Sequence, residues 1–311
     1  MTLPFRRGLA ASATLFALTT AAQAHGIAGD RFFPVTLAID DPAVSDEASL
    51  PTFARSIGPD GSREHDYSFE YDKRITENFG VSVSDTYTQL RPGGSGFQNV
   101  ELGLKYVAYV NAAHEFMFSV GASAEIGGTG APAIADGFTS LGPQVYFGKG
   151  FGDLPTSLDP LRPFAVTGQI GLAIPTRARS VTTTPDPDGG PADVDIDKHP
   201  TVLNWGFSLQ YSLPYLNSHV HEVTGPDVLK RLIPLVEVAL QSPVAYVPDG
   251  AHITTGTVNP GVLYEGDTYQ IGVEALLPIN TASGKHPGFV VQLHYFLDDI
   301  FPTTLGRPII Q

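Results

Sequence analysis

Several features common in proteins are scarce or missing in this chain of 311 residues. It contains no cysteine, so packing and hydrogen bonds must hold the fold together without disulfides. Beyond residues 1–24, no apolar stretch is long enough for a helical membrane span, which excludes membrane insertion by helices. Basic residues are outnumbered, with 18 Lys and Arg against 32 Asp and Glu. Such a chain repels phosphate backbones, and nucleic acid is therefore excluded as a partner.

The first 24 residues have the pattern of a cleaved secretory signal. Arg6 and Arg7 form a basic start, an Ala- and Leu-rich run follows, and Ala22-Gln23-Ala24 supplies a small-x-small cleavage site. The apolar run is too short to anchor the chain in a membrane comfortably. Removing this segment leaves 16 basic and 32 acidic residues, so the mature chain has a net charge of −16.

Long alternating segments dominate the remainder. In LNWGFSLQYSL at 203–213, large apolar residues alternate with small or polar ones, and this period of two predicts a strand with one apolar face. Similar alternation occurs in 100–110, 116–126, 164–174, 269–279 and 289–297, and more weakly near 67–75, 79–89, 141–148, 234–241 and 256–265. Strands in soluble proteins average about five or six residues, whereas a tilted strand crossing a bilayer needs roughly nine to eleven. The length of these segments therefore favours a membrane barrel.

The expectation of an even number of strands predicts a twelfth strand. Bacterial single-chain barrels have an even number of strands, and the alternating segments number eleven. The only room for another lies around 48–56, ASLPTFARS, despite Pro51. The predicted fold class is all-β: an antiparallel up-and-down transmembrane β-barrel of about 12 strands. The predicted organisation is a signal peptide at 1–24, a periplasmic N-terminal segment at 25–47, the barrel at 48–298 and a C-terminal tail at 299–311.

Four stretches carry a resemblance to known proteins. They are HGIAGDRFFPVTLAIDDP at 25–42, DYSFEYDKRITENFGVSV at 66–83, YFGKGFGDLP at 146–155 and NPGVLYEGDTYQIGVEALLPIN at 259–280. They resemble a group of proteobacterial outer-membrane proteins that is distantly similar to the MetA-pathway phenol-degradation barrel family. The resemblance implies a barrel and, more weakly, transport of hydrophobic or aromatic compounds. It implies no catalytic residues.

Charged residues on the strands are the first candidate site. On the barrel interpretation these side chains are assigned to the inner face and would line the lumen: Glu70, Asp85, Glu101, Lys105, Glu115, Glu125, Glu237, Glu265, Glu274 and His294. Buried charges need pairing or hydration. A hydrated lumen with this acidic excess favours cations, whereas a closed plug of side chains and salt bridges would only fill the barrel. Both interpretations remain open from sequence, as does constriction of the lumen by 175–200.

Two weaker candidates could bind metal. Asp186 and Asp188 precede Asp193, Asp195 and Asp197 in a predicted external loop, and alternate carboxylates can present oxygens to calcium. The spacing lacks the distal Glu of a calcium loop, so a solvated loop is favoured. On an extended segment, His219 and His221 would point the same way and could hold zinc or copper. No third ligand has clear spacing, which favours surface histidines.

The leading functional hypothesis is an outer-membrane barrel for passive or facilitated passage of a small solute through a polar, acidic lumen. One alternative is a non-conducting barrel with a structural, adhesive or stress-related role. Another is a lipid-modifying outer-membrane enzyme, although no G-x-S-x-G elbow occurs in the chain. The expected partners are outer-membrane lipid, the solute, and the barrel-assembly machinery during insertion. No cofactor is expected.

Overall fold

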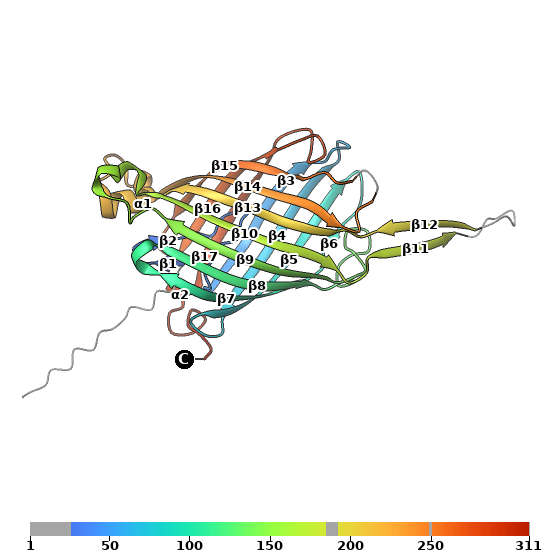
Figure 1. Cartoon of the computed structure of the whole chain (residues 1–311), viewed down its shortest axis with the longest axis horizontal. Coiled ribbons are helices and arrows are strands. Elements are labelled where there is room, and N and C mark those ends of the chain that lie inside the picture. The colour runs from blue at the N-terminus through green and yellow to red at the C-terminus, as the bar shows by residue number, and fades with distance from the viewer. Residues whose placement is uncertain (1–25, 185–191, 249–250, 311) are drawn as a thin grey trace, which may run out of the picture.

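Twelve antiparallel strands form a closed barrel in the computed structural model, which describes residues 26–184, 192–248 and 251–310. Neighbouring strands pair in chain order, and the last strand pairs with the first, which closes the ring (Figure 1). The strands are β3 (Glu47–Ile57), β4 (Arg63–Arg74), β5 (Phe79–Arg91), β7 (Glu101–Asn111), β8 (Phe116–Glu125), β9 (Ser140–Gly150), β10 (Phe164–Pro175), β13 (Thr201–Tyr211), β14 (Leu232–Ala245), β15 (Thr255–Glu265), β16 (Tyr269–Pro278) and β17 (Gly288–Phe296). The predicted fold class and strand count are confirmed, including the twelfth strand around 48–56.

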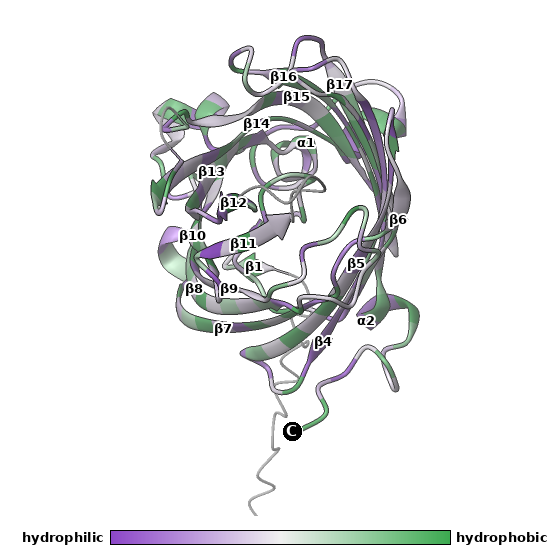
Figure 2. Cartoon of the chain, turned by 90° about the vertical axis from the view of Figure 1, so that its right-hand side faces the viewer, coloured by the Kyte–Doolittle hydropathy of each residue, from purple (hydrophilic) through white to green (hydrophobic). Residues whose placement is uncertain are grey.

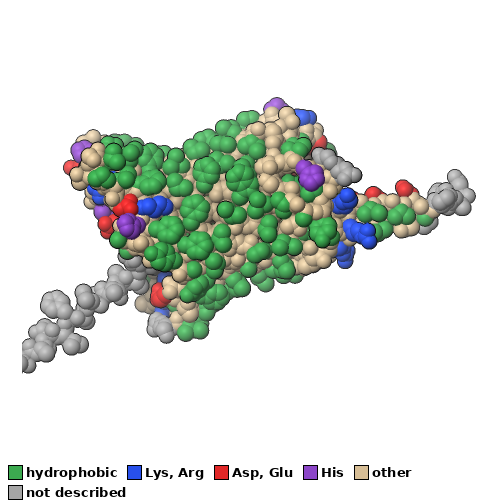
Figure 3. All heavy atoms as spheres, viewed as in Figure 1, with side chains coloured by type: hydrophobic (Ala, Val, Ile, Leu, Met, Phe, Trp, Pro, Cys, Tyr) green, Lys and Arg blue, Asp and Glu red, His purple; other side chains and the backbone are tan. Residues whose placement is uncertain are grey.

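The alternation along β13 shows which face of the barrel is apolar. Trp205, Phe207 and Leu209 point outward and are exposed, whereas Ser208 and Gln210 between them are buried inside. The same outward apolar residues occur around the ring, and Figure 3 shows them covering the barrel wall. So much exposed apolar surface is unfavourable in water but matches acyl chains, while closure of the sheet satisfies the backbone hydrogen bonds that lipid cannot. The outer face is therefore the lipid-facing surface.

Aromatic residues gather at the two ends of the strands. At one end, the rings of Phe164 and Tyr211 contact each other edge-to-face with centroids 4.7 Å apart. At the other end, Tyr87 and Phe97 do so at 5.3 Å. Aromatic residues prefer the two interfaces of the bilayer, so these pairs mark the limits of the membrane-spanning zone.

The two ends of the barrel differ in their connections. One end, called here the termini end, carries short turns at 75–78, 112–115 and 266–268. It also holds α2 (Leu297–Ile300) and the helical turns η1 (Ala112–His114), η2 (Thr156–Leu161), α1 (Leu213–Tyr215), η3 (Leu216–Val220) and η4 (Asp227–Arg231) (Figure 1). Two connections at this end, 151–163 and 212–231, are long and contain most of these turns. Among the described residues, no helix has the length and apolarity needed to cross a membrane.

The opposite end, called the hairpin end, bears the longer loops. β6 (Ser95–Phe97) adds to the edge of β5, and β11 (Arg179–Thr184) pairs with β12 (Asp193–Lys198). Figure 1 shows that the β11–β12 hairpin projects away from the barrel. This arrangement of the described part of 175–200 differs from a loop folded inward as a constriction.

The chain before β3 lies inside the barrel. Residues 26–46, called here the luminal strap, begin with the small hairpin β1 (Ile27–Ala28) and β2 (Arg31–Phe32). Looking along the barrel, Figure 2 shows β1 within the ring of strands. The segment 25–47 was predicted to be a periplasmic N-terminal segment before the barrel, and the structure places its described part within the ring of strands. Residues 1–25, which include the predicted signal peptide, lie outside the described residues.

Candidate functional site

One inward carboxylate holds the middle of the luminal strap. Glu237, on β14, accepts backbone hydrogen bonds from Leu37 at 3.1 Å, Ala38 at 2.8 Å and Ile39 at 3.2 Å. Its side chain is fully buried. A carboxylate that accepts several N–H donors forms charge-assisted bonds, which are roughly twice as strong as neutral ones. Glu274, on β16, lies beside Glu237 and is also buried. Glu237 therefore joins the luminal strap to the inner wall of the barrel. Its three hydrogen bonds with Leu37, Ala38 and Ile39 are called here the Glu237 latch.

Small and apolar residues of the wall make room for the strap. A Cβ atom at Gly206, within the LNWGFSLQYSL stretch, would lie 2.5 Å from Cδ1 of Ile39. A Cβ atom at Gly272 would collide with the side chain of Leu37. Leu37 also packs on a buried inward cluster of Ile233, Leu235 and Leu263. The inner glycines of β13 and β16 thus leave space that the strap fills.

A buried ion pair fixes the start of the strap at the termini end. Arg31 Nε donates to Glu115 Oε2 at 3.1 Å, and its guanidinium also donates to the carbonyls of Arg162 and Pro163 at 2.5 and 3.2 Å. The hydroxyl of Tyr215 donates to the other Glu115 oxygen at 2.8 Å. Burial, together with the Glu115 carboxylate, raises the pKa of Tyr215 to about 12. Glu115, in the turn between β7 and β8, therefore anchors the start of the luminal strap at the termini end of the barrel.

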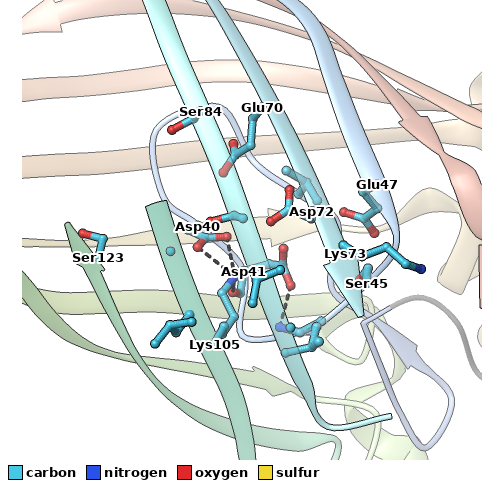
Figure 4. A pocket seen from close by; sticks show the side chains of 18 of the residues that line it. Asp40, Asp41, Ser45, Glu47, Glu70, Asp72, Lys73, Ser84, Lys105 and Ser123 are labelled. Carbon is cyan, nitrogen blue, oxygen red and sulfur yellow. Dashed lines mark hydrogen bonds and ion pairs between the residues drawn. The ribbon is translucent and has the colours of Figure 1, made fainter. Parts of the chain in front are cut away.

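A cavity of about 180 Å³ lies between the strap and the inner wall. Its wall on β5 includes the inward residues Gly80, Ser82 and Ser84, whose small size leaves the space open. Glu70 and Asp72 flank these residues on β4, because Glu70 pairs with Ser84 and Asp72 with Ser82 (Figure 4). The cavity therefore results from one strand with small inward residues beside a strand with carboxylates.

The cavity contains more negative than positive charge. Glu101 and Lys105 line it from β7, and the strap contributes Asp40 and Asp41. The Lys105 ammonium donates to Asp40 at 2.8 Å and to the carbonyl of Asp41 at 3.0 Å. Lys105 thus binds Asp40 directly, and the carboxyl groups around the cavity outnumber its cations.

Residues of the first and last strands meet at the edge of the same cavity. Nδ1 of His294, on β17, lies 2.9 Å from the hydroxyl oxygen of Ser49 on β3. Its Nε2 lies 3.0 Å from Oε2 of Glu47, so an imidazolium would complement that carboxylate. All three side chains are buried. The order Ser, His and Glu resembles a hydrolytic triad in residue types and distances. The surrounding carboxylates would oppose the oxyanion that such chemistry forms.

The structure places most of the predicted lumen residues on the inner face. By contacts or pairing register these are Glu70, Glu101, Lys105, Glu125, Glu237, Glu265, Glu274 and His294. They do not form one group: Glu70, Glu101, Lys105 and His294 line the cavity, Glu237 and Glu274 lie at the latch, Glu125 accepts a hydrogen bond from Asn99, and Glu265 ends β15.

Asp85 is a correction to the predicted set. It pairs with Phe69, whose side chain points outward, and its neighbour Ser84 lines the cavity. Because side chains alternate along a strand, Asp85 faces outward and does not line the lumen. Its spacing of two residues from Val83, which is exposed on the outer face, was the signal that could have placed it correctly.

The proposed metal ligands are not brought together. Asp193, Asp195 and Asp197 lie along β12, whereas Asp186 and Asp188 fall outside the described residues. His219 sits in the helical turn η3 with its ring stacked on Tyr215, and His221 follows in extended conformation, so the expected extended pair is wrong. Across residues 26–184, 192–248 and 251–310, no three His, Asp or Glu side chains are arranged to hold a metal ion.

Sequence reasoning missed much of the cavity lining, including Glu47 and Ser49 and the four residues that follow. Asp40 and Asp41 were overlooked because the strap was assigned outside the barrel. Asp72 shares the inward register of Glu70 two residues away, so the alternation alone could have identified it. Tyr146, on β9, lines the cavity with a side chain that is only 2 % exposed. Its inward direction follows from its pairing with Ser119, whose hydroxyl donates to the Pro42 carbonyl of the strap.

The closed strand ring, the apolar outer wall and the polar interior define a transmembrane β-barrel of the outer-membrane type. No protein-family model and no curated protein matches the chain. Among solved structures, the KdgM porin has a TM-score of 0.46 at 12 % identity, covering 79 % of this chain and 97 % of that chain. The beta domain of the Bordetella autotransporter BrkA has a TM-score of 0.47 at 11 % identity, covering 80 % and 98 %. A variant of TodX, a monoaromatic hydrocarbon channel, has a TM-score of 0.36 at 12 % identity, covering 80 % and 76 %.

Proposed function

We propose that this protein is an outer-membrane channel for small solutes whose lumen is gated by the luminal strap. The observation that carries the proposal is the Glu237 latch, which holds the strap through three backbone hydrogen bonds. The strap supplies no strand to the barrel wall. It can therefore move without breaking the ladder of strands, and its displacement would open the lumen at the termini end.

The acidic cavity supports a preference for cationic solutes. Carboxylates that line a narrow pore favour cations and disfavour anions, because a low-dielectric wall strengthens their field. The resemblance to the MetA-pathway phenol-degradation barrel family implies hydrophobic or aromatic solutes instead. In this proposal residues 1–24 direct export to the outer membrane and are removed.

A liposome-swelling assay tests the proposal. Proteoliposomes would be challenged with small amines, sugars, amino acids and aromatic acids of similar size. We expect amines to enter faster than sugars of equal size and aromatic acids to enter slowest. Fastest entry of aromatic acids would favour the solute class that the family resemblance implies. If no solute enters, even through a variant with a weakened latch, the barrel is non-conducting and the structural or adhesive alternative holds.

The geometry at Ser49 favours a second candidate, hydrolysis of an ester. Ser49 would attack the carbonyl carbon while His294 takes its proton and returns it to the leaving alcohol; water would then release the acyl group. A fluorophosphonate probe tests this directly, because it labels an activated serine irreversibly. Labelling of the natural chain but not of Ser49→Ala or His294→Gln would support an enzyme. Absence of labelling in the natural chain would eliminate this candidate.

A further inference from the structure

We infer that the luminal cavity is a binding site for a small organic cation with two ammonium groups, of the α,ω-diamine class. The inference rests on the proposed function, because it names the class of solute that the lumen would take. Three observations support the inference: the charges that line the cavity, the hydroxyl of Tyr146 that borders it, and the volume of the cavity.

Three carboxyl groups of the cavity have no cation in direct contact. Glu70, Asp72 and Glu101 make no hydrogen bond and no close ion pair within the described chain, whereas Asp40 is paired with Lys105 and Glu47 with His294. Lys105 attracts Glu70 and Asp72 only at longer range, because its ammonium is held by Asp40. Lys73 also borders the cavity, but its ammonium donates to Asp46 and to carbonyls of the C-terminal tail. The carboxyl groups of the cavity therefore outnumber its cations, and a bound cation would compensate this excess.

The pairing register spreads these carboxylates over a short distance. Glu70, Ser84 and Glu101 lie in one row across β4, β5 and β7. Adjacent strands are about 4.8 Å apart, so the backbones at Glu70 and Glu101 are about 10 Å apart. Asp72 lies two residues along β4 from Glu70, about 7 Å away. Charges spaced in this way suit two separated ammonium groups better than one compact ion.

The hydroxyl of a buried tyrosine supplies an independent sign of a ligand. Tyr146 lines the cavity and is 2 % exposed as a residue, and its hydroxyl is open to the cavity without a hydrogen bond to the described part of the chain. Its ring is in contact with the Lys105 ammonium, 4.7 Å from the centroid, which fixes its position. Buried hydroxyls are normally satisfied by protein or water. This hydroxyl can accept a hydrogen bond from an ammonium group held by the carboxylates.

The size of the cavity and the arrangement of its ligands select an organic cation. A water molecule needs roughly 10–15 Å³ of such space, so about 180 Å³ admits about a dozen waters or a small organic molecule. No three acidic or histidine side chains of the described residues converge as metal ligands. A flexible diamine can reach carboxylates that are too far apart to coordinate one metal ion.

Isothermal titration of the purified protein in detergent micelles with 1,4-diaminobutane tests the inference. We expect one binding site, no binding of the neutral 1,4-butanediol, and at least tenfold weaker diamine binding in Asp72→Asn and in Glu101→Gln. Asp85→Asn is the matched control, because it removes the same charge from the outer face of the neighbouring strand. Retention of the strand circular dichroism spectrum would show that each variant is folded, and the two cavity variants lie on different strands.

Three results would overturn the inference: no diamine binding, equal affinity in the cavity variants and in Asp85→Asn, or displacement of the diamine by calcium chloride at equal concentration. The last result would identify a divalent-cation site instead. The titration does not depend on conduction. Binding without solute passage would reject the channel and keep the site, whereas passage without binding would reject the site and keep the channel.

Discussion

Weakening the Glu237 latch should open the channel. In Glu237→Gln the negative charge is lost, and the side-chain amide keeps one acceptor oxygen for the three N–H groups of Leu37, Ala38 and Ile39. The substitution changes neither the volume of the side chain nor the pairing of β14 with its neighbours. Its direct effect should therefore be limited to the strap and to the adjoining Glu274.

The expected magnitude follows from the lost hydrogen bonds. A hydrogen bond to a charged group contributes about 1.5–3 kcal/mol net, and the variant loses one or two such bonds. A loss of about 3 kcal/mol shifts the equilibrium between bound and released strap by roughly a hundredfold. The contacts of Arg31 with Glu115 and of Lys105 with Asp40 remain, so the strap stays tethered on both sides of residues 37–39. The ratio of open to closed time should rise by about that factor.

Single-channel recording in planar bilayers measures this ratio. Glu125→Gln is the matched control, because it removes a luminal carboxylate that bonds to Asn99 and does not touch the strap. Gly272→Leu provides a second route to the open state, since its side chain would occupy the position of Leu37. Equal open times in the natural protein, Glu237→Gln and Gly272→Leu would refute gating by the strap.

Four further outcomes are expected. Trp205 is the only tryptophan and faces outward, so brominated phospholipid should quench its fluorescence strongly and aqueous iodide weakly; the reverse would place this face in water. Val44→Cys with Gly80→Cys should form a disulfide that holds the channel closed until a reductant is added, because a Cβ at position 80 lies 2.7 Å from Val44 Cγ1; unaltered gating after verified oxidation would contradict the strap model. Glu115→Gln leaves a buried guanidinium without its carboxylate and should destabilise the fold by about 3–5 kcal/mol, seen as a lower urea midpoint in micelles; an unchanged midpoint would show that the pair contributes little. Glu101→Gln should move the reversal potential in a potassium chloride gradient toward zero, and a constant potential would mean that this carboxylate does not line the path.

Local sequence was sufficient for the barrel wall. The alternation in 203–213 determined the outward position of Trp205 and the inward position of Gln210, because side chains of a strand alternate whatever its neighbours are. Strand length and parity then gave twelve strands, including the one interrupted by Pro51. Asp85 was assigned to the lumen because it is charged, although the alternation along β5 places it on the outer face. The sequence therefore contained the information needed to place this residue.

Only the tertiary structure determined what lies inside the wall. The luminal strap has no alternation, and its partners are distant in sequence: Glu237 lies 200 residues after Leu37, and Lys105 lies 65 residues after Asp40. Ser49 and His294, 245 residues apart, meet because the first and last strands close the ring. A periodic pattern reports the environment of each strand face, whereas the cavity depends on which distant residues the closed barrel brings together. The sequence therefore determined the wall, and the closure of the barrel around the strap determined the site.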